Sequence, residues 1–226
     1  LSNLIRFEPW AKIMCALTHL HCHRVLHRDL SPSNIFISTG GQAFKACVID
    51  TKHRVVLGDF GASCVLQTPV SASAIGDLAE RDTDDTITKG SANMCTYQFR
   101  APEAFIDKGP YSYPSDVWST GVNILFMHCC AVPFGKMKVR WSDRYVVFHS
   151  MLTRIADYNG TLTDTQQLFQ DSVKLSKVLQ ELKLKSAGTF ANLTPATRGH
   201  PFIDMIANML HLRPTERPLA RTLMSH

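Results

Sequence analysis

Apolar residues along this chain recur most clearly at helical spacing, in four segments. In the first, Pro9 suits the first turn of a helix, because its missing N–H would have no intrahelical partner there. One apolar face follows, made of Trp10, Ile13, Met14, Leu17 and Leu20. Three further helices are predicted at 116–131, at 145–155 and at 202–212, the last ending before Pro214. The segment 116–131 is apolar nearly all round, which is typical of a helix buried on every side.

Three short apolar runs between the first two of these helices predict β-strands. They lie at 35–37, 47–49 and 55–57, with polar residues between them. The segment 61–90 has no clear period and is rich in Ser, Thr, Asp and Ala. It predicts a long surface loop, and loops of this length are usually functional or disordered. The predicted fold class is therefore mainly α with a few short β-strands.

The overall composition narrows the class of protein. The sequence has 226 residues, of which 45% are apolar and 19% are charged. This ordinary globular composition excludes a disordered tail, a collagen-like fibre and a coiled coil, and the length allows one domain or two small ones. The longest mostly apolar stretch, 121–135, contains Asn123 and His128. It is shorter than the ~20 residues that a membrane span needs, so no membrane span is expected.

Charge and cysteine content bear on partners and compartment. The net charge is +5, but the basic residues are scattered with no run of four or more, so no nucleic-acid partner is expected. The seven cysteines are odd in number and form no C-x-x-C pair, which favours free thiols in a reducing compartment. No basic-then-apolar leader follows Leu1, so nothing predicts a secretory signal. A cytoplasmic or nuclear location is expected.

The most informative segment runs from His27 to Asn34 and matches the catalytic-loop pattern H-R-D-L-x-x-x-N. A D-F-G tripeptide follows at 59–61 and an A-P-E tripeptide at 101–103. D-F-G alone is a weak signal, because a chain of this length contains it by chance about 3% of the time. The ordered set is specific: a catalytic loop after a helix, D-F-G after a strand, then a loop and A-P-E.

In this order the motifs resemble the C-terminal lobe of a eukaryotic-type protein kinase, and the resemblance covers nearly the whole chain. The run D-V-W-S-x-G at 116–121 is similar to the buried-helix motif of the family, and R-P-T-E-R-P at 213–218 is similar to its closing helix. The runs R-V-L-H-R-D at 24–29 and R-A-P-E at 100–103 favour a serine/threonine kinase of the cyclin-dependent or MAP kinase group.

The resemblance implies a fold and a division of the chain. The fold would be the C-terminal lobe of the two-lobed α+β kinase fold, with the N-terminal lobe absent. We expect a helix and the catalytic loop in 1–34, an extended β-hairpin in 35–58, the activation segment in 59–103 and a helical subdomain in 104–226. The hairpin and the loop 61–90 look longer than the family norm. Insertions in surface loops are cheap, so these could be decoration or a docking surface.

The resemblance also implies phosphoryl transfer with ATP and Mg²⁺ as cofactors. Asp29 would accept the proton of the acceptor hydroxyl and orient it towards the γ-phosphate. Asn34 and Asp59 would supply hard oxygen ligands, which suit Mg²⁺ bridging the ATP phosphates. Gly61 would give the backbone freedom directly after this metal ligand, where the activation loop can swing.

Regulation by phosphorylation is implied by the same resemblance. Arg28, next to the catalytic Asp, is a natural partner for a phosphate on the activation loop. Ser91 lies where the activating phosphate is expected, and Thr86 and Thr88 are nearby competitors. The expected partners are a protein substrate and an activating kinase or a regulatory subunit.

Five more residues are assigned by resemblance. Thr96 would contact the catalytic loop, and it lies with Arg100 in the region that positions the substrate peptide. Glu103, Asp116 and Arg217 are expected to brace the lobe without chemistry, with Arg217 paired to Glu103.

Two departures from the family pattern leave a rival function open. The sequence contains no G-x-G-x-x-G loop and no V-A-I-K-like strand lysine, so only half of an ATP site is expected. The chain alone would therefore be inactive, and Leu1 is interpreted as a cut edge. Ser31 stands where serine/threonine kinases carry the Lys that contacts the transferred phosphate, and Ser33 where tyrosine kinases carry an Arg. The expected function is ATP-dependent phosphoryl transfer to Ser or Thr of proteins. The alternative is a pseudokinase or scaffold that uses the helical lobe to bind proteins.

Two residue groups have competing interpretations outside this scheme. Several histidines crowd the first helix, but only His19 and His23 share a helical face and Cys22 is the only thiol nearby, so a metal site is disfavoured. Cys95 could act as a redox handle, but a buried small apolar residue is favoured there.

Overall fold

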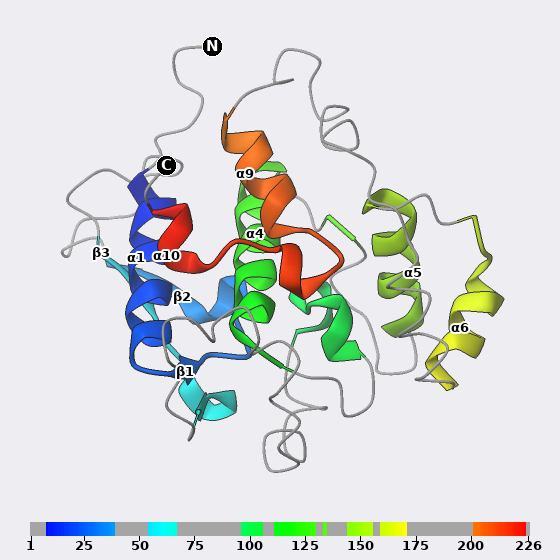
Figure 1. The fold of residues 1–226 in the computed structure, drawn as a ribbon, viewed down its shortest axis with the longest axis horizontal. Helices are drawn as coiled ribbons and strands as arrows, with labels where there is room; N and C mark the ends of the chain where they lie inside the picture. The colour runs from blue at the N-terminus through cyan, green and yellow to red at the C-terminus, as the bar shows by residue number, and fades with distance from the viewer. Residues whose placement is uncertain are drawn as a thin grey trace.

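The computed structural model describes residues 8–38, 54–66, 96–105, 111–129, 133–134, 144–155, 159–170 and 201–224. Within these ranges the fold is mainly helical, with two small antiparallel sheets beside the first helix (Figure 1). The helices are α1 (Glu8–Cys22), α4 (Tyr113–Cys129), α5 (Arg144–Ile155), α6 (Leu162–Gln170), α9 (Pro201–Met209) and α10 (Ala220–Leu223). The strands are β1 (Val25–Leu26), β2 (Ile35–Ser38), β3 (Arg54–Leu57) and β4 (Cys64–Val65). None of these helices is long and apolar enough to cross a membrane.

The helices predicted from periodicity are present with shifted ends. Helix α4 begins at Tyr113, three residues before the predicted start, and α9 ends at Met209, three residues before the predicted end. The sequence reading missed α6, whose start carries a reciprocal cap. The Thr161 N–H donates to the Asp164 carboxylate at 2.6 Å, and the Asp164 N–H donates to the Thr161 hydroxyl at 3.2 Å. This T-x-x-D pair is a local signal from which the helix start could have been found.

Two of the three predicted strands form an antiparallel hairpin. Ile35 pairs with Leu57 and Ser38 with Arg54, so the two ends of the hairpin are in register. The predicted strand at 47–49 lies outside the described residues, as does most of the loop 61–90. The loop prediction is wrong at its start, because Cys64–Val65 pairs with β1. A strand of two residues is too short to show a period in the sequence.

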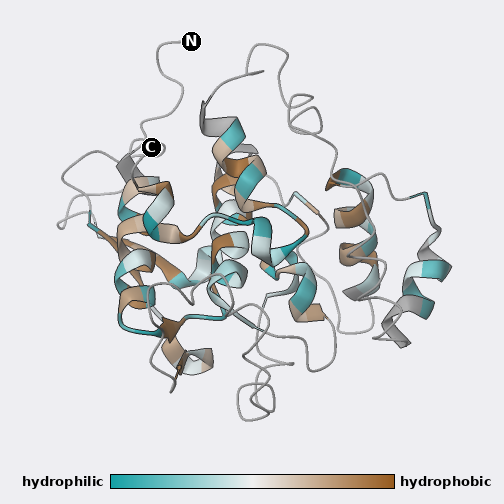
Figure 2. Cartoon of the chain, viewed as in Figure 1, coloured by the Kyte–Doolittle hydropathy of each residue, from teal (hydrophilic) through white to brown (hydrophobic). Residues whose placement is uncertain are grey.

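Helix α4 is the centre of the hydrophobic core. Val117, Trp118 and Ile124 are fully buried, which agrees with the prediction of a helix covered on every side. Helices α1 and α9 both pack on α4, and α5 also contributes apolar residues to this core (Figure 2). The approach of α9 is close at Gly121, where an added Cβ would lie 3.0 Å from the Met209 Cβ. The core thus anchors α1 and α4, whose ends flank the catalytic-loop motif.

Candidate active site

The Asp29 carboxylate lies at the centre of the candidate site. Its Oδ1 accepts a hydrogen bond from the backbone N–H of Thr96 at 3.2 Å, and its Oδ2 accepts one from the Asn34 amide at 3.1 Å. Each donor fixes one oxygen, so the carboxylate is oriented from both sides. Asp29 is half-buried and keeps some access to solvent. The structure therefore brings together three of the residues assigned from sequence, and Thr96 takes part through its backbone.

Asp116 holds the backbone of the loop that contains Asp29. This carboxylate is fully buried and accepts hydrogen bonds from the backbone N–H groups of His27 at 2.8 Å and Arg28 at 2.9 Å. His21 Nε2 lies 3.2 Å from the same carboxylate. Arg28 has a left-handed backbone with φ of 65°, which is sparsely populated for a residue with a side chain and is tolerated when surrounding contacts determine it. Asp116 thus holds the two residues that precede Asp29.

Asn34 ends a short 3₁₀ turn, Pro32–Asn34, and enters β2 directly. Its side-chain amide also donates to the backbone carbonyl of Asp29 at 2.8 Å. Because a carbonyl can only accept, this contact assigns the amide nitrogen to the Asp29 side and turns the Asn34 Oδ1 away from it. The Gly58 N–H donates to the Asn34 carbonyl at 2.9 Å, so the residue before Asp59 is tied to Asn34.

Asp59 follows β3 at the same end of the hairpin as Asn34. Its backbone is left-handed, with φ of 59° and ψ of 72°, and its Oδ1 accepts a hydrogen bond from the Gly61 N–H at 3.3 Å. The left-handed residue of the D-F-G motif is Asp59, and the freedom expected of Gly61 for movement of the loop stays a prediction. Space beside Gly61 is tight, since an added Cβ would lie 3.2 Å from the Asp59 Oδ1. Asp59 is exposed, so its carboxylate is accessible.

Ser31 is buried, with 1% of its surface exposed. Its hydroxyl lies 2.7 Å from the hydroxyl of Ser33, which in turn lies 3.5 Å from the Asn34 Oδ1. The position at which the family pattern places a lysine thus holds a buried serine, and the hydroxyl of Ser31 contacts that of Ser33. A longer side chain at this position would have to break that contact to reach the surface.

Arg28 points its side chain to the segment that follows D-F-G. Its Nε donates to the backbone carbonyl of Ala62. The three candidate phosphorylation residues, Ser91, Thr86 and Thr88, lie outside the described residues. The pairing of Arg28 with a phosphate therefore stays a prediction.

Arg100 lies in the interior, with 6% of its surface exposed. Its guanidinium lies 4.8 Å from the ring centre of Tyr97 and 5.8 Å from that of Phe105. This packing fixes the 3₁₀ turn Tyr97–Phe99 that follows Thr96. The contribution of Arg100 to substrate positioning stays a prediction.

Glu103 and Arg217 form a buried ion pair. The two guanidinium nitrogens of Arg217 donate to the two carboxylate oxygens of Glu103 at 2.7 and 2.8 Å. The Ser115 hydroxyl donates to the same carboxylate at 2.6 Å, and the Arg217 guanidinium lies 4.9 Å from the Trp118 ring centre. None of these contacts involves Asp29, which fits the structural role expected for Glu103 and Arg217.

The sequence reading missed an apolar platform beside these polar residues. Phe36, two residues after Asn34, is 53% exposed, and Val56, its partner across the hairpin, is 45% exposed. An added Cβ at Gly58 would lie 2.5 Å from the Phe36 ring, so the glycine leaves room for this ring. An apolar residue on the face of β2 that alternates with the core-facing residues was the available signal.

The metal interpretation of the early histidines finds no support in the described residues. The His19 and His23 ring centres lie 4.2 Å apart with the rings tilted at 42°, and His23 Nδ1 lies 2.8 Å from the His19 carbonyl, which occupies this ring nitrogen. Within the described ranges no group of three His, Cys, Asp or Glu side chains is arranged to hold a metal. Cys95 lies outside these ranges.

Comparison with known proteins gives a match to a family model and matches to individual relatives. A family model described as the protein kinase domain matches residues 5–226. GLH-binding kinase 1 of Caenorhabditis elegans is 28% identical over 94% of this chain and 48% of its own length. Mitogen-activated protein kinase 2 of Pneumocystis carinii is 26% identical over 95% of this chain and 51% of its own length. The chain spans about half the length of the curated relatives it matches.

A solved structure shares the fold. A chain of the CAK complex from Chaetomium thermophilum bound to ATP-γ-S superposes with a TM-score of 0.64, at 19% identity, over 96% of this chain and 56% of the other. At this identity the likeness concerns the arrangement of the helices and strands.

Proposed function

Because this chain belongs to the protein kinase family, we propose that it carries the metal-binding and acceptor-positioning half of an enzyme that transfers the γ-phosphoryl group of ATP to Ser or Thr hydroxyls of proteins. The observation that carries the proposal is the Asp29 carboxylate, oriented by the Thr96 backbone and the Asn34 amide. Phosphoryl transfer depends almost entirely on positioning and on charge stabilisation, and this arrangement supplies the positioning.

Asp29 is the proposed acceptor of the hydroxyl proton. Both of its oxygens already accept a hydrogen bond, so the carboxylate cannot rotate freely and presents its remaining lone pairs in fixed directions. A substrate hydroxyl that donates to one of them would be aligned for transfer. The buried Asp116 supports this alignment by holding the backbone of His27 and Arg28.

Asn34 and Asp59 are the proposed ligands of Mg²⁺. The Asn34 amide nitrogen is occupied by Asp29, which leaves its Oδ1 directed elsewhere, and the Asp59 carboxylate is exposed at the same end of the hairpin. These hard oxygen donors fit the preference of Mg²⁺. When bound, the ion would bridge the ATP phosphates and neutralise their charge.

Phe36 and Val56 are the proposed contact surface for the nucleotide base. Their exposed side chains form an apolar patch on β2 and β3, next to the residues proposed to hold the metal. A planar base gains stabilisation from stacking on an aromatic ring and from burying apolar area. The patch therefore continues the ATP site from the phosphates towards the base.

The described elements are proposed to form the C-terminal lobe of the kinase, divided at the boundaries expected from sequence. In this interpretation the phosphate-covering glycine loop and the strand lysine, which do not occur among these 226 residues, belong to the other half of the nucleotide site. The proposed partners are a protein substrate and an activating kinase or regulatory subunit. The proposed location is cytoplasmic or nuclear.

The test uses the protein expressed from its complete coding sequence. Asp29→Asn is expected to lower phosphate transfer from radiolabelled ATP to a basic peptide by about 10²- to 10⁴-fold, the usual contribution of a positioned proton acceptor. Asp204→Asn, an exposed carboxylate on α9, is the matched control and should retain activity. Equal activity of the Asp29 variant and the wild type would exclude this assignment.

A non-catalytic scaffold is the second candidate function, and Ser31 is the observation that favours it. A buried hydroxyl replaces the cation that the family pattern places at the reacting phosphate. If the wild-type protein transfers no phosphate while it binds Mg²⁺ and ATP, the scaffold becomes the better description.

A further inference from the structure

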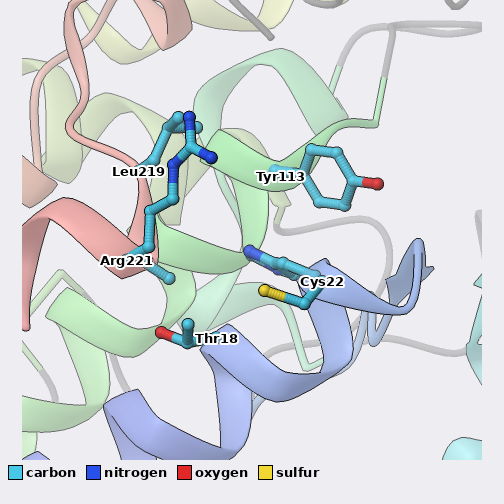
Figure 3. Close-up of a pocket in the computed structure, with 7 residues that line it drawn as sticks. Thr18, Cys22, Tyr113, Leu219 and Arg221 are labelled. Atoms are coloured by element: carbon cyan, nitrogen blue, oxygen red, sulfur yellow. The ribbon is translucent and has the colours of Figure 1, made fainter. Parts of the chain in front are cut away.

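A pocket lies beside α10, and neither Asn34 nor Asp59 lines it. It is bounded by the end of α1, the start of α4 and the start of α10, and has a volume of about 80 Å³. Figure 3 shows Arg221 and Tyr113 on its two sides and Cys22 between them. The Tyr113 ring, Leu219 and Ala220 give it apolar walls. None of the residues assigned to catalysis lines this pocket.

The charge at the pocket is positive. Arg221 is exposed, and within the described part of the chain it has no ion-pair or hydrogen-bond partner. None of the seven described residues that line the pocket is acidic. The carboxylate of Asp116 lies behind His21, but it is fully buried and already accepts hydrogen bonds from two backbone N–H groups. An anionic group at the mouth, beside an apolar body inside, is therefore complementary to this pocket.

The volume limits the size of the apolar body. About 80 Å³ is roughly half of the ~150 Å³ of an apolar cavity that holds benzene. A branched chain of three or four carbons suits this space better than a ring. The chemical class that fits size, polarity and charge together is a short branched aliphatic carboxylate.

The floor of the pocket is connected to the catalytic loop by one side chain. His21 lines the pocket, and its Nε2 lies 3.2 Å from the Asp116 carboxylate, so the ring nitrogen donates to it. The same carboxylate accepts the backbone N–H groups of His27 and Arg28. The His21 ring also packs against Tyr113 at 4.7 Å, on the opposite side of the pocket from Arg221. A ligand that packs on His21 would restrict the ring and stabilise the Asp116 contacts.

We propose that this pocket binds a small branched aliphatic carboxylate and that the occupied pocket stabilises the catalytic loop through His21 and Asp116. The proposal does not rest on phosphoryl transfer. It concerns binding and the stability of backbone hydrogen bonds, which can be measured in an inactive protein.

Binding is tested through the reactivity of Cys22. The probe is isovalerate, and the rate of alkylation by iodoacetamide is followed for each thiol by mass spectrometry at constant ionic strength. At ten times its dissociation constant, isovalerate should slow alkylation of Cys22 about tenfold, because the free site is depleted by 1 + [L]/Kd. Cys15 is the internal control: it is exposed on the same helix, lies 3.9 Å from the Met224 sulfur and does not line the pocket. Its rate should not change.

Two comparisons test the charge. Isovaleramide has the same shape without the negative charge and should protect Cys22 much less. Arg221→Gln should abolish the difference between acid and amide, and this exposed substitution is not expected to disturb the fold. Equal protection by acid and amide in the wild type, or no protection of Cys22 by either, would overturn the proposed ligand class.

Coupling to the loop is tested by hydrogen exchange at the amides of His27 and Arg28. Under the same conditions isovalerate should slow their exchange up to about tenfold in the wild type, since ligand binding stabilises only the closed state. Exchange in α5, which does not line the pocket, should be unaffected. Protection of Cys22 without slower exchange at these two amides would show a binding site that is not coupled to the loop, and this part of the proposal would be wrong.

Discussion

The guanidinium of Arg217 and the carboxylate of Glu103 meet in two parallel hydrogen bonds across 114 positions of sequence. Both side chains are nearly fully buried, and the guanidinium also donates to the carbonyls of His211, Pro114 and Leu212. The planar fork of Arg matches a carboxylate in a way that a Lys ammonium cannot. This pair therefore fastens the segment before α10 to the A-P-E motif at the start of the helical part.

Removal of this pair should be strongly destabilising. Arg217→Ala leaves the Glu103 charge buried without its partner, and breaking a buried pair typically costs about 3–5 kcal/mol. Urea unfolding followed by circular dichroism measures the change. Arg213→Ala is the matched control, because Arg213 is 50% exposed in its pair with Glu216 and should cost no more than ~1 kcal/mol. Similar losses for the two variants would contradict this explanation.

Gly121 is expected to be required for packing and not for backbone freedom. Gly121→Ala gains ~1 kcal/mol of helix propensity, but the new methyl group meets the Met209 Cβ at 3.0 Å and Leu210 at 3.1 Å. Overpacking costs about 1–3 kcal/mol, so the melting temperature should fall. Thr153→Ala, an exposed position on α5, provides the control, since it gains propensity without overpacking and should raise the melting temperature. A stabilised Gly121→Ala would show that α4 and α9 can separate at low cost.

Local patterns were sufficient for the main elements of the fold. Helices α1, α4 and α5 and the hairpin of β2 and β3 each carry enough residues to show a period, and the motif around Asp29 brings the acid and Asn34 together within one turn. The hydrophobic periodicity of the sequence does not predict side-chain contacts between residues far apart in the chain. The donation of the Thr96 N–H to Asp29 joins residues 67 positions apart, and only the family resemblance indicated that Thr96 contacts the catalytic loop.

The features that no sequence pattern indicated have a common physical cause. The left-handed backbone at Asp59 and the buried position of Arg100 are both set by neighbours, whereas the residue types alone favour glycine for the first and solvent for the second. The exposed ring of Phe36 is likewise a property of what lies beside it. Propensity is a weak prior wherever tertiary contacts decide.

The stability of the protein should decrease in mild acid because of His211. Burial lowers the pKa of this imidazole below 6.5; Arg217 and Arg213 act in the same direction, and Glu216 opposes them. Although Glu216 lies 2.7 Å from Nε2, the burial effect is larger, so we treat the ring as neutral, with Nε2–H donating to the carboxylate. The unfolded chain then binds a proton more readily than the folded chain, and the contribution of the neutral ring is lost as pH falls from about 6.5 through the lowered pKa.

The measurement compares the free energy of unfolding at pH 7.5 and pH 5.0. Wild type should lose more stability between these values than His211→Gln, which keeps a donor for Glu216 and does not titrate. The difference between the two proteins isolates His211 from the other nine histidines of the sequence. An identical pH dependence would show that this imidazole titrates alike in the folded and unfolded chains.

Ser31 provides the sharpest test of whether the site is built for catalysis. In the complete protein, Ser31→Lys should raise turnover, because a cation at the transferred phosphate stabilises the transition state; an arginine finger supplies about 10³ to 10⁵ in comparable chemistry. The substitution also breaks the 2.7 Å contact between Ser31 and Ser33, which costs some order in the loop. Ser31→Met has a long side chain without the charge, so it measures that structural cost alone. Turnover of the Lys variant should exceed that of the Met variant by at least about tenfold. If the two variants are equally active, another cation already fills this role or the site does not transfer phosphate, and the Asp29→Asn variant distinguishes the two.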